Sequence, residues 1–375
     1  MIENESHIEE IANEFAIAGE FVGGEEIHSG HINSTYMATF RKPSGSSGQY
    51  IFQRINEKVF KDPFAVMRNV EMVTRHINWK VLRVKKDLGG QTLNLYPARG
   101  GRFYAQGDGG GVWRCYNFIE GCKTYDIVEN TRQAYQAGHA FGSFQDLVSD
   151  IDVEDIEETI PDFHHTPKRY ARLLEVIEAD PCGRVASAKE EIEFILARES
   201  YTNKLISLSD DGILPVRITH NDTKINNVMI DVETDEAVCV IDLDTVMPGL
   251  SLYDFGDLVR TVVSPAAEDE TDLSKVEMRM PMFEALAEGY MDGCDCLCEA
   301  EIENLVFAGK LISLEIGIRF LTDYLEGDVY FKTKREQHNL DRARTQLALV
   351  DKLEQNEETM EAFVSRLAKA RKLGG

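Results

Sequence analysis

The sequence contains no apolar run of about 18 residues, the length that a transmembrane helix needs. Its opening stretch, MIENESHIEEIANEF, is acidic and amphipathic, and it lacks the basic start and apolar stretch of a signal peptide. Basic side chains are also scarce, since 40 Lys and Arg face 65 Asp and Glu, a net charge of −25. A nucleic-acid backbone would meet net repulsion, whereas a small anion can still bind where a metal ion and local cations offset the field. We therefore expect a cytoplasmic protein with no membrane and no nucleic-acid partner.

The seven cysteines do not suggest a disulfide framework, because they are odd in number and scattered along the chain. This usage fits a reduced compartment. Cys294, Cys296 and Cys298 are spaced like metal ligands, but no second Cys or His pair of zinc spacing accompanies them. We therefore expect a turn between two helices that carries free thiols.

The first third of the chain has the pattern of strands. STYMATF (34–40) and QYIFQRI (49–55) are rich in β-branched and aromatic residues, and PSGSSG between them supplies turn residues. The segment 62–78 begins with Asp and Pro and repeats apolar residues at helical spacing. Three more strands are predicted at 92–97 (TLNLYP), 101–106 (GRFYAQ) and 111–118 (GVWRCYNF). This region predicts a five-stranded antiparallel sheet with one main helix.

The remainder of the chain has mostly helical periodicity. Strand patterns interrupt it only at ILPVRIT (213–219), NVMID (227–231) and AVCVIDL (237–243). We therefore predict an α+β protein with an N-terminal lobe, 1–116, and a larger, mostly helical C-terminal lobe, 117–375. The predicted helices of the second lobe cover 131–148, 187–209, 276–292, 299–326 and 341–372.

A polar cluster, HNDTKINN (220–227), stands between two of these strands. Asp222 and Asn227 have the spacing of a phosphoryl-transfer loop, and Asp242 follows in the next strand. A carboxylate can accept the proton of an attacking hydroxyl, and hard oxygen ligands can hold Mg²⁺ against the phosphates. Lys224 can direct its ammonium group toward the transferred phosphoryl group. The alternative interpretation is a solvated polar turn, which accounts for neither the strand context nor the later Asp.

HNDTKINN, IDLDT and LYDFGD resemble the aminoglycoside phosphotransferase and choline kinase superfamily, relatives of the protein kinases. Within it, GHINSTY (30–36), IDLDTVMPG (241–249) and EIGIRFLTDYLEGDVYF (315–331) are similar to the N-acetylhexosamine 1-kinases. The resemblance implies a bilobal, protein-kinase-like fold with ATP bound in the cleft.

The same resemblance assigns roles within the catalytic loop. Asp222 would be the catalytic base, and Asn227 and Asp242 the Mg²⁺ ligands, with Asp244 as a weaker candidate for the metal. His220 matches a position that holds the loop, and Asp254 matches an Asp that steadies it.

The resemblance also places the nucleotide. Backbone groups of Asn117 and Ile119 would meet adenine, and Gly30 would belong to the nucleotide loop, where a structural hairpin explains this single glycine almost as well. A kinase of this type usually has Lys where this chain has Gln53. Since Gln carries no charge, Arg54 or Mg²⁺ would have to compensate, and a pairing with Glu71 is not expected.

For the acceptor, the resemblance implies that Arg319 and Tyr330 contact the sugar, because they offer a planar donor fork and a ring with a hydroxyl. The alternative is an Arg319 paired with Asp323 or Glu326 on one helix face, with Tyr330 in the core. His164 and His165 have no metal partner in view and are interpreted as local structure.

The expected activity is ATP- and Mg²⁺-dependent phosphorylation of the anomeric hydroxyl of N-acetylglucosamine or N-acetylgalactosamine, so that the partners are a sugar and a nucleotide. Two alternatives stay open. One is a kinase of another small hydroxyl compound, such as an amino alcohol or an aminoglycoside. The other is a non-catalytic pseudokinase that binds nucleotide, which Gln53 would permit.

Overall fold

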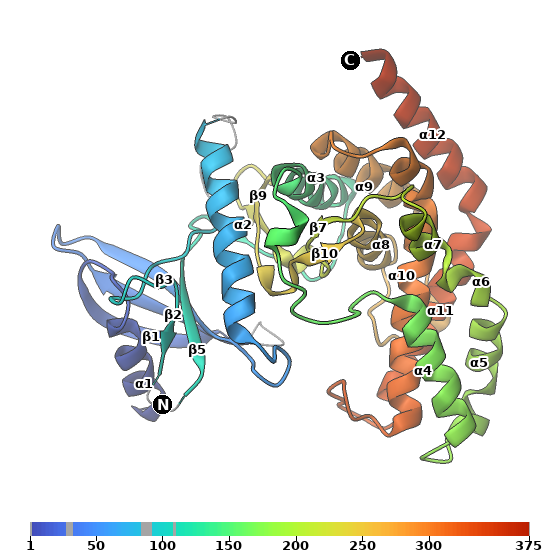
Figure 1. The fold of residues 1–375 in the computed structure, drawn as a ribbon, viewed down its shortest axis with the longest axis horizontal. Coiled ribbons are helices and arrows are strands. Elements are labelled where there is room, and N and C mark those ends of the chain that lie inside the picture. The colour runs from blue at the N-terminus through green and yellow to red at the C-terminus, as the bar shows by residue number, and fades with distance from the viewer. Residues whose placement is uncertain (1, 28–32, 84–91, 108–109, 375) are drawn as a thin grey trace.

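The computed structural model describes residues 2–27, 33–83, 92–107 and 110–374. A sheet with two flanking helices forms one end of the molecule, and a larger helical part forms the other (Figure 1). This is the α+β architecture that the sequence predicts. In the described part of the chain, we find no helix that is both long and apolar enough to cross a membrane.

The N-terminal sheet has five antiparallel strands in the order β1-β2-β3-β5-β4. Successive side chains of β3 point to opposite faces, so that Tyr50 and Phe52 are buried against the first helix, where Phe15 packs edge-on against Phe52. The elements of this part are α1 (Ile2–Asn13), β1 (Glu20–Ile27), β2 (Ser34–Arg41), β3 (Ser47–Arg54), α2 (Pro63–Arg83), β4 (Ala105–Gln106) and β5 (Val112–Asn117).

Three of the five predicted strands are confirmed as β2, β3 and β5, whereas the other two differ from the prediction. The segment 101–106 contributes only the two residues of β4, and 92–97 only an isolated bridge between Leu95 and Tyr116. The sequence analysis missed β1, because EFVGGEEI contains two Gly and three Glu that hide a strand pattern.

Helix α2 is the predicted helix and lies over the other face of the sheet. The Asp62 carboxylate accepts hydrogen bonds from the backbone N–H groups of Phe64 and Ala65, both at 3.0 Å, and so caps the helix. Val70 and Val73 are fully buried, and each contributes about 1.5–3 kcal/mol of hydrophobic stabilisation.

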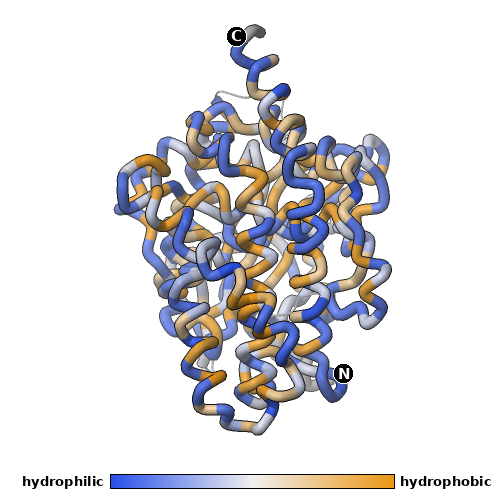
Figure 2. Tube along the Cα trace, turned by 90° about the vertical axis from the view of Figure 1, so that its right-hand side faces the viewer, coloured by the Kyte–Doolittle hydropathy of each residue, from blue (hydrophilic) through white to orange (hydrophobic). Residues whose placement is uncertain are grey.

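In the C-terminal part, the long helix α10 is buried on nearly all sides and packs against α4, α8, α11 and α12. Helices α3 and α9 touch along their backbones, since a Cβ atom at Gly138 would lie 2.2 Å from the Leu286 carbonyl oxygen. Hydrophilic and hydrophobic residues are interspersed along the chain trace (Figure 2). The helices are α3 (Thr131–Val148), α4 (Thr166–Ala179), α5 (Lys189–Leu196), α6 (Glu199–Thr202), α7 (Lys204–Asp210), α8 (Ser251–Val262), α9 (Met280–Gly293), α10 (Glu299–Glu326), α11 (His338–Gln355) and α12 (Glu357–Gly374).

Several predicted helices differ in detail. The stretch 187–209 is divided among short helices, and 341–372 is broken where Asn356 donates a side-chain hydrogen bond to the Lys352 carbonyl. Helices α1, α4 and α8 are not predicted from the sequence. Helix α8 is almost completely buried, polar residues included, so it lacks the one-sided pattern of a surface helix.

The small β region of the C-terminal part carries the polar cluster. Strand β7 (Arg217–Thr219) pairs with β10 (Met247–Gly249), and β8 (Val228–Asp231) pairs with β6 (Cys122–Lys123) and β9 (Ala237–Val240). A shared hydrophobic cluster joins this region to the N-terminal sheet and includes Ile55, Val70, Phe144, Ile218 and Leu243. The boundary between residues 116 and 117 stays a prediction.

Candidate active site

The loop between β7 and β8 brings Asp222, Lys224 and Asn227 together. The Lys224 Nζ lies 2.9 Å from Asp222 Oδ1. The Asn227 amide nitrogen donates to the Asp222 backbone carbonyl at 2.9 Å and to its carboxylate at 3.3 Å. The predicted base, cation and metal-binding amide therefore form one cluster.

Helix α8 fixes this loop from behind. The Asp254 carboxylate accepts hydrogen bonds from the backbone N–H groups of His220 (2.8 Å) and Asn221 (2.7 Å), and Asp257 accepts one from Thr223 at 3.0 Å. Burial raises the pKa of Asp254 to about 7, although the two backbone donors oppose the shift. These contacts support the interpretation of Asp254 as the residue that steadies the loop.

His220 is fully buried, with the rings of Phe141 and Phe144 packed edge-on against it at 5.2 and 5.6 Å. Its Nε2 lies 3.0 Å from the Ile241 carbonyl oxygen, and its Nδ1 accepts from the Asp222 backbone N–H at 3.3 Å. Burial lowers the pKa of His220 and so favours the neutral ring. This environment supports a structural role for His220.

The Asp222 carboxylate is predisposed to be ionised. Burial raises its pKa, but the charge and the hydrogen bond of Lys224 outweigh burial, and the pKa lies below its usual value. The Asp222 charge in turn raises the pKa of Lys224. An ionised carboxylate beside an ammonium group can accept a proton and pair with a phosphate.

Asp242 follows β9 in a left-handed backbone conformation, with φ of 62°. Within the described residues, no hydrogen bond or ion pair engages its carboxylate. Burial, together with the nearby charges of Asp244 and Asp222, raises its pKa to about 7. In the bonds above, Asn227 uses only its side-chain nitrogen. Its side-chain oxygen is therefore available to a cation. Hard oxygen donors with crowded negative charge fit Mg²⁺.

Asp244 is already engaged, which argues against its role as a metal ligand. The carboxylate accepts a hydrogen bond from the Asn33 amide at 2.6 Å and forms a short ion pair with Arg114. Arg114 is completely buried on β5 and also donates to the Gln53 side-chain oxygen at 2.8 and 3.0 Å. The sequence analysis missed Arg114, although a charged residue inside the apolar strand GVWRCYNF was a signal.

The structure does not bring Arg54 into this cluster. Arg54 is exposed and follows Gln53 in β3, so the alternation of the strand directs it to the opposite face, near Tyr36 and Gly111. The expected compensation by Arg54 is therefore not supported by its position. Glu71 pairs with Arg75 at 3.0 Å. Gly30 lies outside the described residues.

The connector between the two parts holds the predicted adenine contacts. The Asn117 backbone N–H donates to the Asn94 carbonyl at 3.1 Å, and its side chain bonds back to residues 92 and 94. The backbone N–H and C=O of Ile119 have no backbone partner among the described residues, whereas the backbone N–H of Asn117 and its side chain are bonded within the connector.

Residues 23–286 match the phosphotransferase enzyme family APH. The chain belongs to this family. Solved structures with the same fold include an aminoglycoside phosphotransferase from Alicyclobacillus acidocaldarius (TM-score 0.59, 12% identity, 96% of this chain and 95% of that one). A spectinomycin phosphotransferase in complex with ADP and spectinomycin has TM-score 0.53 and 13% identity, covering 90% and 94%. A Plasmodium vivax ethanolamine kinase has TM-score 0.53 and 14% identity, covering 86% and 81%.

On α10 of this phosphotransferase, Arg319 lies between two aromatic rings. Its guanidinium carbon is 5.3 Å from the centre of the Phe163 ring and 5.8 Å from that of Phe331. Within the described residues, Arg319 forms no hydrogen bond or ion pair. Tyr330 is 65% exposed and packs edge-on against Phe331.

The alternative pairing of Arg319 with Asp323 or Glu326 is wrong. Asp323 instead accepts hydrogen bonds from the backbone N–H groups of Val329, Tyr330 and Phe331 at 2.7–3.0 Å. Glu326 accepts from Arg172. Tyr330 is also not a core residue, as its exposure shows. Asp323 thus fixes the segment that carries Tyr330 and leaves Arg319 free.

His164 connects this region to the catalytic loop of the phosphotransferase. Its Nδ1 lies 2.8 Å from Glu315, one turn before Arg319 on α10, and its Nε2 lies 3.2 Å from the Asn221 carbonyl oxygen. His165 caps α4. Both histidines are therefore structural, as expected, and Glu315, one helical turn before Arg319, is linked to the catalytic loop through His164.

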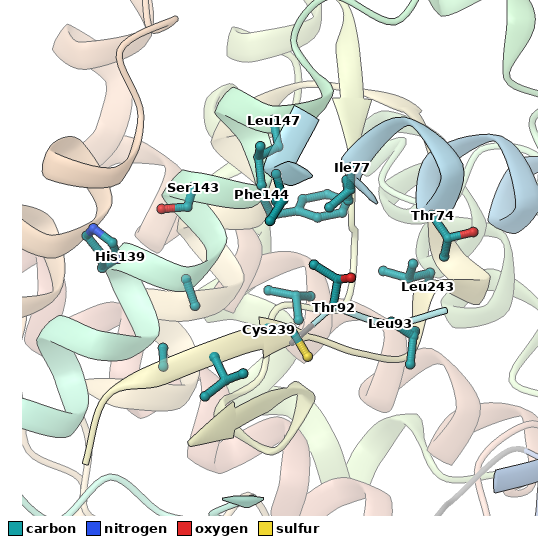
Figure 3. Close-up of a pocket in the computed structure, with 15 residues that line it drawn as sticks. Thr74, Ile77, Thr92, Leu93, His139, Ser143, Phe144, Leu147, Cys239 and Leu243 are labelled. Atoms are coloured by element: carbon teal, nitrogen blue, oxygen red, sulfur yellow. The ribbon is translucent and has the colours of Figure 1, made fainter. Parts of the chain in front are cut away.

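A separate cavity of about 90 Å³ lies between α2, α3 and β9 (Figure 3). Its described lining contains no Lys, Arg, Asp or Glu. Phosphates require cations or several donors, so this apolar cavity does not fit the triphosphate. Leu243, the neighbour of Asp242, forms part of its wall.

Proposed function

We propose that this phosphotransferase uses ATP and Mg²⁺ to phosphorylate the anomeric hydroxyl of an N-acetylhexosamine, N-acetylglucosamine or N-acetylgalactosamine, and so forms the sugar 1-phosphate. The family and the catalytic cluster support phosphoryl transfer to a hydroxyl group. The free Arg319 supports a sugar as the acceptor.

In this proposal, Asp222 accepts the proton of the attacking hydroxyl. Its low pKa keeps the carboxylate ionised, and Lys224 at 2.9 Å keeps it oriented. When the phosphoryl group approaches, the Lys224 ammonium can turn toward its oxygens, which carry the developing negative charge.

Asp242 and the oxygen of Asn227 would hold Mg²⁺. When bound, Mg²⁺ neutralises the charge of the phosphates and orients them. Ionised Asp242 then gains a counter-charge that Arg114 and Lys224 provide only in part, since burial and the neighbouring carboxylates still raise its pKa. Ile119 would receive the adenine edge through its free backbone groups.

The environment of Arg319 is the single observation that carries the sugar assignment. A guanidinium beside two rings, whose acidic neighbour Glu315 is already hydrogen-bonded to His164 and Thr166, can donate to hydroxyl or acetamido oxygens of a neutral sugar. Tyr330 on the segment fixed by Asp323 can add a ring face and a hydroxyl.

The same charge disfavours a cationic acceptor such as ethanolamine or an aminoglycoside. Arg169 lies close enough to Arg319 for the two charges to repel, and the neighbouring Arg319 lowers the pKa of Arg169 in addition to the larger effect of burial. A protonated amine entering here would meet two guanidinium groups. The pseudokinase alternative is disfavoured because Arg114 supplies a buried positive charge beside Gln53.

The test is a panel of acceptors with ATP and Mg²⁺, in which ADP release is measured. It should include N-acetylglucosamine, N-acetylgalactosamine, glucose, choline, ethanolamine and an aminoglycoside. We expect turnover with the N-acetylated sugars and little with the amines. Turnover with an amine alone would contradict the sugar assignment but leave the kinase assignment intact, and binding of ATP without turnover with any acceptor would indicate a pseudokinase.

A further inference from the structure

The linker between α9 and α10 holds two thiols in contact. The Cys294 Sγ and Cys296 Sγ atoms are 3.3 Å apart. Cys294 is 1% exposed, whereas Cys296 is only partly buried. The predicted turn with free thiols is present, and in the described part of the chain no group of three or more His, Cys, Asp or Glu residues could hold a metal ion. The third cysteine of the run, Cys298, caps α10.

The two thiols have different environments, which shift their pKa values in opposite directions. The hydrogen bond from Cys294 and the positive charge of Arg217 lower the pKa of Cys296, although burial opposes them. The same hydrogen bond, together with burial, raises the pKa of Cys294. Cys296 is thus the sulfur that loses its proton more readily and the more accessible one, and Cys294 is the thiol in contact with it.

We propose that Cys294 and Cys296 form an oxidisable dithiol site that reacts with a peroxide. The Cys296 thiolate attacks one peroxide oxygen, the O–O bond breaks, and a sulfenic acid and hydroxide form. The hydroxide takes the Cys294 proton and becomes water. The Cys294 sulfur, now a thiolate, then attacks the Cys296 sulfur, and the S–O bond breaks with release of hydroxide, which takes a proton from solvent and becomes the second water. Both sulfurs are oxidised, the peroxide oxygens are reduced, and a Cys294–Cys296 disulfide remains.

A cavity beside the linker provides space for a small oxidant next to the dithiol. It has a volume of about 250 Å³ and is bounded by the linker, the start of α10 and the end of α12, with Cys294 in its wall. Cys296, the attacking sulfur, does not line this cavity but is itself only partly buried. Two ion pairs hold α12 over it, Arg371 to Asp295 at 2.7 Å and Lys372 to Glu299 at 2.9 Å. Hydrogen peroxide is only slightly larger than water, so a cavity of this volume accommodates it.

The linker is also connected to the catalytic loop. Arg217 on β7 donates to the Cys296 backbone carbonyl at 2.6 Å and forms an ion pair with Glu301 at 2.7 Å. Glu301 accepts from Ser251 at 2.6 Å, the first residue of α8, which carries Asp254. A disulfide must turn the backbone around residue 295, because the two sulfurs move from contact to bonding distance. That rotation displaces the carbonyl that Arg217 binds.

The first experiment detects the disulfide without any activity measurement. The full chain is treated with hydrogen peroxide, alkylated and digested without reduction. We expect the peptide that contains residues 294–298 to lose two hydrogens, with Cys298 alone alkylated. The variant Cys294→Ser should instead give a sulfenic acid at Cys296, trapped by dimedone. Alkylation of all three cysteines after treatment, or a disulfide that includes Cys298, would overturn the proposal.

The second experiment follows ATP turnover before and after oxidation. We expect kcat to fall about two- to thirtyfold, the range of coupling between distant sites, and to recover with dithiothreitol. Cys298→Ser should respond like the unmodified protein, and Cys294→Ser/Cys296→Ser should not respond. A disulfide without any change of kcat would overturn the coupling to the catalytic loop. If the sugar is not phosphorylated at all, the proposed function fails, while the mass measurement still decides the dithiol site.

Discussion

Arg114 on β5 lies directly opposite Gln53 on β3, and its guanidinium joins the Gln53 amide to the carboxylate of Asp244. Gln53 belongs to the N-terminal sheet, and Asp244 follows the metal-binding candidate Asp242 in the C-terminal part. The buried cation therefore spans the two parts beside the catalytic cluster. It lies beside Gln53, the position at which the resemblance led us to expect a Lys.

We predict that Arg114→Met destabilises the protein strongly, because it leaves Asp244 buried without its partner. Breaking a buried pair in this way costs about 3–5 kcal/mol in the free energy of unfolding. Arg114→Lys should recover part of this loss, since it restores the charge but not the fork that reaches Gln53. Urea unfolding measures both effects. The control is Arg54→Met, an exposed residue at the end of the neighbouring strand, for which we expect a change within about 0.5 kcal/mol. Equal effects at the two positions would contradict the role of Arg114.

Asp222→Asn should abolish proton acceptance while preserving the shape of the loop. We expect kcat to fall by about two to four orders of magnitude, with the KM for ATP nearly unchanged. Steady-state kinetics with saturating sugar provides the measurement. Glu233→Gln, an exposed residue in the turn after β8, serves as the control and should leave kcat unchanged. Retention of normal turnover by the Asp222 variant would remove this residue from the role of base.

Arg319→Ala should weaken the interaction with the sugar far more than that with ATP. Loss of a charge-assisted hydrogen bond costs about 1.5–3 kcal/mol, which corresponds to roughly tenfold to more than a hundredfold in kcat/KM for the sugar. Arg172→Ala is the matched control, because Arg172 is a surface residue paired with Glu326 near the same segment. A sugar KM that is unchanged in the Arg319 variant, or one that changes equally in both, would exclude Arg319 from the acceptor site.

The buried carboxylate of Glu315 should make the stability of the protein depend on pH. Burial raises its pKa, but the charge and hydrogen bond of His164, the charge of Arg319 and the hydrogen bond of Thr166 outweigh burial, and the pKa of Glu315 is lowered. A carboxylate with a lowered pKa stabilises the fold above its unfolded pKa of about 4.3, and this contribution is lost as pH falls through the folded value. Glu315→Gln should therefore be less stable than the unmodified protein at pH 7, and the difference should shrink below about pH 4.3. A difference in unfolding free energy that is constant down to pH 3 would contradict this assignment.

Strands and site residues that depend on local sequence pattern could be predicted from the sequence. The alternation in residues 34–40 and 49–55 predicted two strands, and the spacing of Asp222, Asn227 and Asp242 predicted a cluster that the structure brings together. Arg114 could not be assigned, because its partners Gln53 and Asp244 depend on strand register and on the docking of the two parts. Likewise, Asp323 lies at a spacing that suggests an ion pair with Arg319. Only the structure shows that the backbone N–H groups of residues 329–331 donate to the Asp323 carboxylate instead.

The position of the phosphate on the product tests the central claim most directly. N-acetylglucosamine is incubated with the protein, ATP and Mg²⁺, and the product is examined by NMR. A sugar held by Arg319 and Tyr330 with its anomeric carbon toward Asp222 must receive the phosphate on C1. The account therefore predicts phosphorus coupling to the anomeric proton, and a phosphate on C6, or a sugar left unmodified while an amino alcohol is phosphorylated, would contradict it.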